Sequence, residues 1–192
     1  MLNIIMCGAP GSGKGTQSDR IVEKYHLAHI STGDLLRKEI ASGSERGNQL
    51  NAIISRGELV PDDIMVAMLG AHIDALGKDC KGVIFDGFPR NVAQAEALEQ
   101  MLAERGLATS VLLDMQVERE ELIDRLLNRG KISGRSDDNL ETIQQRLIVY
   151  EEKTKPVSGF YEKLGKYQAI NGMGTMDEIF HRIEEVIEDL KI

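Results

Sequence analysis

Residues Gly8–Thr16 read Gly-Ala-Pro-Gly-Ser-Gly-Lys-Gly-Thr and directly follow the apolar run Leu2–Cys7. The spacing Gly-x4-Gly-Lys between a strand and a helix is typical of a phosphate-binding loop. Glycines let the backbone wrap around an anion, and the N–H groups at the start of the helix donate to phosphate oxygens. We therefore predict a phosphate site here, with Lys14 supplying a positive charge to the terminal phosphates.

One position of this loop departs from the usual pattern. The Ser or Thr that normally follows the lysine is Gly15, and a hydroxyl group appears only at Thr16. Whether a hydroxyl group of this loop binds Mg²⁺ directly is therefore open. The loop predicts nucleotide binding, but it does not by itself select a reaction. The tetrapeptide Asn-Lys-x-Asp, with which GTPases bind guanine, does not occur in the sequence.

Short apolar runs alternate with helical patterns along the rest of the chain. The predicted strands are residues 2–7, 28–30, 83–85, 111–113 and 167–170, and the third and fourth end at Asp86 and Asp114. Strands that are apolar on both faces belong in parallel sheets covered by helices. We predict an α/β protein with a three-layer P-loop NTPase fold, in which helices cover both faces of a five-stranded parallel sheet.

Two stretches interrupt this alternation and are predicted to be inserts in a single domain that spans residues 1–192. Residues 31–61 have a helical pattern broken by glycines, and residues 130–138 are short and polar. Both are expected to lie beyond the carboxyl ends of the strands, where ligands of open α/β sheets bind. The run Asp138–Glu141 resembles a capping box and predicts the start of a helix.

Composition excludes several classes of function. Acidic residues outnumber basic ones and the net charge is −8, which disfavours general nucleic-acid binding. No apolar run approaches the about 20 residues that span a bilayer, so we expect no membrane partner and a cytoplasmic location. Two cysteines are too few for a structural zinc site of the usual cysteine-rich kinds, so no structural zinc is expected.

A second phosphate site is predicted where the third strand ends. Asp86 stands at the end of that strand, where it can serve a metal directly or through water. Arg90 follows on a stiff Gly-Phe-Pro turn, which is a good mount for a bidentate contact with phosphate. The stretch 30–37 adds a helix start and a further arginine, Arg37.

Three segments resemble the adenylate kinases, within the nucleoside monophosphate kinases. They are the loop 8–16, the stretch Ser-Thr-Gly-Asp-Leu-Leu-Arg at 31–37 and the stretch Asp-Gly-Phe-Pro-Arg at 86–90. The resemblance runs over essentially the full chain. It implies the reaction ATP + AMP ⇌ 2 ADP with Mg²⁺, an AMP-binding insert at 31–61 and a short lid at 130–138. Nucleotides would be its partners, and the enzyme would be a monomer.

The resemblance also implies a role for individual residues. Metal would be held by Asp86, through water. The implied ATP-binding residues are Gly11, Ser12, Gly13, Lys14, Gly15, Thr16, Arg129 and Gly174. The implied AMP-binding residues are Thr32, Arg37, Glu58, Leu59, Val60, Gly87, Phe88, Pro89, Arg90, Gln94, Arg135 and Arg146. The implied catalytic residues are Lys14, Arg90, Arg129, Arg135 and Arg146.

Spacing alone leaves the arginines with two interpretations. Arg125 and Arg129 are four residues apart and share a helix face, which is equally typical of a solvated face with ordinary ion pairs. The family pattern places Arg125, Arg129, Arg135 and Arg146 around the transferred phosphoryl group, and it favours this role most for the last three.

Two alternative functions also remain open from the sequence. A UMP/CMP kinase of the same fold typically has Ala at the position of Thr32 and Asn at that of Gln94. A nucleotide-binding switch without turnover would not need this set of arginines.

Overall fold

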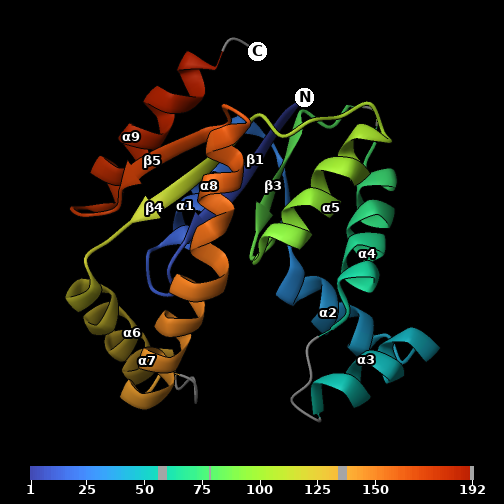
Figure 1. The fold of residues 1–192 in the computed structure, drawn as a ribbon, viewed down its shortest axis with the longest axis horizontal. Helices are drawn as coiled ribbons and strands as arrows, with labels where there is room; N and C mark the ends of the chain where they lie inside the picture. Colours follow the sequence, from blue (N-terminus) through green and yellow to red (C-terminus); the bar gives the residue numbers. More distant parts are fainter. Residues whose placement is uncertain (56–59, 78, 134–137, 191–192) are drawn as a thin grey trace.

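The computed structural model describes residues 1–55, 60–77, 79–133 and 138–190. Within these residues, five strands form one parallel sheet in the order β2-β3-β1-β4-β5 (Figure 1). The strands are β1 (Leu2–Gly8), β2 (Ala28–Ser31), β3 (Gly82–Asp86), β4 (Val111–Gln116) and β5 (Tyr167–Asn171). The predicted α/β fold with a five-stranded parallel sheet is therefore confirmed.

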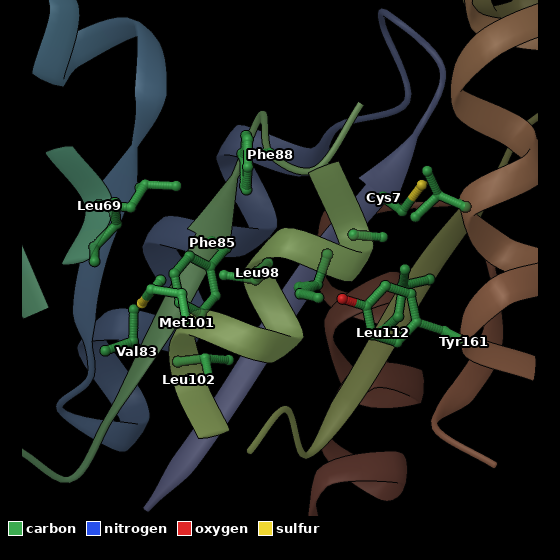
Figure 2. Packing of buried hydrophobic residues seen from close by; sticks show 14 of the residues in the cluster. Cys7, Leu69, Val83, Phe85, Phe88, Leu98, Met101, Leu102, Leu112 and Tyr161 are labelled. Atoms are coloured by element: carbon green, nitrogen blue, oxygen red, sulfur yellow. The ribbon is translucent and has the colours of Figure 1, made fainter. Parts of the chain in front are cut away.

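Helices cover both faces of the sheet, because the side chains of each strand alternate between the two faces. On β1, Ile5 and Cys7 join the core formed with α4 (Asp62–Asp74), α5 (Val92–Ala103) and α8 (Lys155–Lys163). Figure 2 shows this core, with Leu98 and Tyr161 packed over the strands. Ile4 and Met6 join the opposite core, which is formed with α1 (Lys14–Tyr25) and α9 (Met176–Asp189). The strands that carry the phosphate loops are thus held rigidly in the middle layer.

Two pairs of helices extend beyond the sheet. They are α2 (Thr32–Ala41) with α3 (Glu45–Ser55), and α6 (Arg119–Ser133) with α7 (Leu140–Val149). Figure 1 shows the two pairs at the same end of the molecule, on opposite sides. The predicted insert 130–138 begins inside α6, because this helix continues to Ser133. The division into a core and two inserts stays a prediction.

A π-helical turn, η1 (Tyr150–Thr154), joins α7 to α8. The N–H group of Lys155 donates to the carbonyl of Tyr150, five residues back, instead of four. Pro156 follows as the second residue of α8 and has no N–H group to donate to the preceding turn. We attribute the wider turn to this missing donor. Turns of this kind occur often at functional sites.

The helix predicted to start at Asp138–Glu141 is confirmed, since α7 begins at Leu140, but two local details differ from the predictions. Asn139 caps α7 instead of Asp138, since its side chain accepts a hydrogen bond from Thr142 N at 3.0 Å. Strand β4 continues to Gln116 because it pairs with β5 from Leu112 to Gln116, so Asp114 lies inside the strand. Its buried carboxylate accepts a hydrogen bond from the Tyr167 hydroxyl at 3.0 Å.

Candidate active site

The phosphate loop connects β1 to α1 as the sequence predicts. The chain turns back after Gly8, and Ser12 N donates to Ala9 O at 3.1 Å. Gly13 has φ +91° directly before α1, a conformation that residues with a side chain rarely adopt. The glycines therefore bring the backbone into position to surround an anion at the start of α1.

Lys14 turns back onto its own loop. Its Nζ donates to the carbonyl of Gly8 at 2.7 Å and to that of Ala9 at 3.2 Å. Burial lowers the pKa of the ammonium group, and the negative charge of Asp86 partly offsets this effect. The positive charge of Lys14 is thus held beside the phosphate loop, between β1 and the end of β3.

The predicted second phosphate site lies beside the first because β1 and β3 are neighbours. Met6 pairs with Asp86 in the parallel register, so the loops after these two strands leave the sheet side by side. The peptide bond Phe88-Pro89 is cis. Phe88 is buried in the core, which leaves only its backbone to face a ligand.

The carbonyl of Gly87 joins three of the predicted AMP-binding residues. It accepts hydrogen bonds from Arg90 Nε at 2.8 Å and from Thr32 Oγ1 at 3.3 Å. Gly87 has φ +81°, and a Cβ atom there would approach Thr32 Oγ1 to 3.1 Å. Glycine therefore lets the start of α2 and the Arg90 loop meet.

Arg90 is also held through its main chain. Its N–H group donates to Gln94 Oε1 at 2.7 Å, and its carbonyl accepts from Thr154 Oγ1 at 3.0 Å. Partial desolvation and the positive charge of Arg146 both lower the pKa of the guanidinium. The two arginines thus repel each other electrostatically, which favours an anion that both can bind.

Asp138 brings two of the predicted catalytic arginines together. Its carboxylate has no exposed surface and accepts from Arg129 Nε and Nη2, each at 2.7 Å, and from Arg146 Nη1 at 3.2 Å. The capping pattern at Asp138–Glu141 predicted a helix start here and not this pairing with the arginines. The acidic character of Asp138 and its place between the arginines were the available signals.

A cavity of about 280 Å³ adjoins the phosphate loop on the side of β4 and α9. Its lining residues are Ser12, Gly13, Thr16, Gln17, Met115, Glu121, Arg125, Gly174, Met176 and Ile179. The structure therefore brings the phosphate loop and Gly174 to the same cavity.

Arg125, which the sequence places with the other arginines around the transferred phosphoryl group, lines this cavity. It pairs with Glu121 at 2.7 Å and donates to the carbonyl of Gly172 at 3.0 Å. Its position four residues before Arg129 was the signal.

Several predicted residues do not take part in these contacts. Arg37 is exposed and pairs with Asp34, which lowers the pKa of that carboxyl group. Val60 packs against the core beside α4. Glu58, Leu59 and Arg135 lie outside the described residues.

Asp86 is the one predicted metal residue. It is half-buried at the end of β3, where His29 Nε2 lies 3.6 Å from its Oδ2. Asp86 raises the pKa of His29, a contact that the sequence analysis did not anticipate. Among the described residues, no group of three or more His, Cys, Asp or Glu side chains could hold a metal. A single carboxylate fits Mg²⁺, which binds mainly to substrate phosphates and water.

Comparison with known proteins identifies the family. A family model described as Adenylate kinase matches residues 6–166. An adenylate kinase of Bacteroides thetaiotaomicron is 57% identical over 190 residues, which cover 99% of this chain and 100% of that protein. The chain belongs to the adenylate kinase family.

Two other adenylate kinases show the same full-length similarity. The adenylate kinase of Porphyromonas gingivalis is 49% identical over 191 residues, which cover 100% of this chain and 98% of that protein. The adenylate kinase of Azobacteroides pseudotrichonymphae is 47% identical over 190 residues, which cover 99% of each protein. Family membership confirms the predicted enzyme class, a nucleoside monophosphate kinase and thus a phosphotransferase. No helix in the described part of this adenylate kinase is long and apolar enough to cross a membrane.

Proposed function

We propose that the chain transfers a phosphoryl group reversibly between ATP and AMP, giving two molecules of ADP. One observation carries this proposal: the two loops in which we predict phosphate sites leave the neighbouring strands β1 and β3 side by side. One loop carries Lys14 and the other carries Arg90, so two phosphorylated substrates can meet there. Adenylate kinases bind ATP, AMP and ADP and use Mg²⁺ with ATP, which agrees with this arrangement.

The donor ATP is proposed to lie along the phosphate loop, with its base in the adjoining cavity. The backbone N–H groups at the start of α1 point to the phosphates. Gly174 and Arg125 both line the cavity, and Arg125 offers a planar cation to the base. Besides Arg125, the proposed ATP-binding residues are those predicted from the sequence: Gly11, Ser12, Gly13, Lys14, Gly15, Thr16, Arg129 and Gly174.

The acceptor AMP is proposed to lie on the other side of Lys14. Thr32, Gly87 and Arg90 are already joined by hydrogen bonds there, which supports a shared pocket. Gln94 lies next to Arg90 and is proposed to bind the adenine base. The remaining proposed AMP-binding residues are Arg37, Glu58, Leu59, Val60, Phe88, Pro89, Arg135 and Arg146.

Catalysis is proposed to rest on positioning and positive charge. The transition state of phosphoryl transfer is loose, and negative charge spreads over the equatorial oxygens. Lys14, Arg90, Arg129, Arg135 and Arg146 would neutralise that charge. The attacking phosphate is already an anion, so no general base is needed. Mg²⁺, held by the nucleotide phosphates and by Asp86 through water, would neutralise further charge on ATP.

Water must be excluded, because it competes with AMP as the acceptor. Arg129 and Arg146 lie on α6 and α7, outside the sheet, and α2 and α3 lie on the opposite side. Movement of these two helix pairs toward each other would close the site before transfer.

The acceptor base tests the proposal directly. Gln94 has a carbonyl oxygen and an amide NH₂ group, which match the N6 donor and the N1 acceptor of adenine. Guanine reverses this pattern, and an unpaired buried polar group costs about 1–3 kcal/mol, or about five- to 150-fold. Steady-state ADP formation from ATP with AMP, GMP, UMP and CMP should show a strong preference for AMP. Gln94→Ala should reduce this preference and leave the KM for ATP unchanged.

Equal kcat/KM for AMP and UMP would point to a UMP/CMP-type acceptor preference, and no turnover with any acceptor would point to a switch. The enzyme is also proposed to act as a cytoplasmic monomer. Light scattering coupled to size-exclusion chromatography measures the mass in solution. A mass other than 21.3 kDa would contradict the proposed monomer.

A further inference from the structure

The side chain of Gln94 bridges two elements of the proposed AMP pocket. Its Oε1 accepts a hydrogen bond from the main-chain N–H of Arg90 at 2.7 Å. Its Nε2 donates to Oδ1 of Asp62, the first residue of α4, also at 2.7 Å. The two ends of the amide are therefore held by partners that lie 28 residues apart in the sequence.

These two partners define the orientation of the amide. A main-chain N–H can only donate, and a carboxylate can only accept. Turning the amide over would set Nε2 against the Arg90 N–H and Oε1 against the Asp62 carboxylate. Both contacts would then be repulsive, so the observed orientation is strongly preferred.

One hydrogen-bonding site remains at each end of the amide. Oε1 keeps a second lone pair and Nε2 keeps a second N–H. Adenine offers an N6–H donor and an N1 acceptor, which match these two sites. A 6-oxopurine such as hypoxanthine offers an O6 acceptor and an N1–H donor, which match only the reversed amide.

We infer that Asp62 is a specificity-determining residue, which holds the Gln94 amide in the orientation that accepts adenine and rejects 6-oxopurines. Asp62 acts as a positioning residue, because it works through Gln94. This inference rests on the proposed function of Gln94 as the residue that binds the acceptor base.

Inosine monophosphate is the sharpest probe, because its base differs from adenine at the 6-position and at N1 alone. The experiment compares kcat/KM for AMP and for inosine monophosphate with ATP as donor. It uses the unmodified enzyme and the variants Asp62→Asn, Asp62→Ala, Asp62→Glu, Asp63→Asn and Gln94→Ala. Asp63→Asn is the matched control, because Asp63 is the next residue of the first turn of α4 and carries the same charge.

Asp62→Asn should raise the ratio of kcat/KM for inosine monophosphate to that for AMP by at least about fivefold, the effect of relieving one mispaired polar group. An asparagine amide can turn either end toward Gln94, so it no longer selects one orientation. Asp62→Ala should raise the ratio as well, and Asp62→Glu should keep it low because a carboxylate is retained. Asp63→Asn should leave the ratio unchanged. A merely structural defect would lower both kcat/KM values together and would not raise this ratio.

Two results would overturn the inference, and they differ in what they say of the proposed function. If Gln94→Ala changes the ratio but Asp62→Asn and Asp62→Ala do not, Asp62 has no role in selectivity and Gln94 keeps its own. If Gln94→Ala leaves the ratio unchanged, the proposed base contact of Gln94 fails, and the role of Asp62 fails with it. Calorimetric titration of each folded variant with AMP and with inosine monophosphate, without ATP, gives the same ratio from equilibrium binding.

Discussion

The hydroxyl group of Thr154 donates a hydrogen bond of 3.0 Å to the carbonyl of Arg90, 64 residues away in the sequence. Thr154 is the last residue of the π-helical turn η1, and Arg146 lies on α7, which leads into this turn. The bond therefore ties the helix that carries one proposed phosphate ligand to the loop that carries another. The two guanidinium groups repel each other, and this bond holds the Arg90 loop in place against that repulsion.

Thr154→Val should weaken AMP binding selectively. Valine has nearly the same shape but no hydroxyl group, so the Arg90 loop loses one attachment. Loss of one hydrogen bond should raise the KM for AMP about two- to tenfold, and the KM for ATP should stay unchanged. Steady-state kinetics with each substrate varied in turn measures both values. Thr154→Ser restores the hydroxyl group and should restore the KM for AMP; an equal rise in both KM values would contradict the role.

Lys14→Met should leave a folded but strongly impaired enzyme. The ammonium group is the proposed partner of the terminal phosphates, and methionine has similar length but no charge. We expect kcat to fall about 10²- to 10³-fold, as when one electrostatic donor to a transition state is removed. Lys163→Met on the exposed end of α8 is the control and should keep full activity. Near-normal turnover of a Lys14→Met enzyme with an unchanged circular dichroism spectrum would exclude the phosphate role.

Replacing Arg135 or Arg146 with Ala should lower kcat more than it raises KM. Interactions made mainly in the transition state show this split, and arginines in this role contribute about 10³ to 10⁵ in rate. Arg105→Ala serves as the control, because Arg105 also pairs with an aspartate, Asp74 of α4, but lies outside the proposed site. A loss of tenfold or less in both variants would leave these two arginines without the proposed catalytic role.

The activity of the enzyme should depend on Mg²⁺ and not on zinc. Chelation of all divalent ions should abolish activity, because the charge of the ATP phosphates is then less well neutralised. A zinc-specific chelator, with Mg²⁺ in excess, should change neither activity nor the melting temperature. Unfolding under the second condition would reveal a structural zinc ion that the sequence analysis did not expect.

Cys7 should resist modification in the folded enzyme. Burial, with a smaller contribution from Asp114, raises the pKa of this thiol to about 11. At about pH 8 the group is therefore protonated, and the thiolate is the reactive form. A Cys80→Ser variant leaves Cys7 as the single thiol and should react with a thiol-specific disulfide reagent only after unfolding. Rapid labelling of that native variant would show that β1 opens far more readily than its burial implies.

The sequence signals that predicted the fold correctly are local ones. The apolar run around Ile5 and the glycines before Lys14 each determine the structure of their own segment, through burial on both faces and through backbone conformation. The signal for the second predicted phosphate loop was equally local, since Asp86 ends β3 as expected.

Contacts between distant segments could not be predicted in this way. The pairing of Asp138 with Arg129 and Arg146 depends on how α6 packs against α7, and a local capping pattern competed with it. Strand β4 ends at Gln116 because it pairs with β5, and no residue of β4 by itself indicates this pairing. Arg125 reaches its cavity only because α6 lies against the phosphate loop, where Gly11 approaches Leu126 closely.

The hydrogen bonds of Lys14 to the carbonyls of Gly8 and Ala9 have a consequence for product release. A phosphate bound at the proposed site would replace these two carbonyls as partners of the ammonium group, which therefore would keep hydrogen-bond acceptors in both states. The net gain would be only the difference between a hydrogen bond from the ammonium group to an anionic oxygen and one to a neutral carbonyl oxygen, because the donor is charged in both. When the nucleotide leaves, the same two carbonyls would again accept hydrogen bonds from the lysine. An ammonium group with partners in both states can hold a phosphate without trapping it, which suits a reaction that must run in both directions.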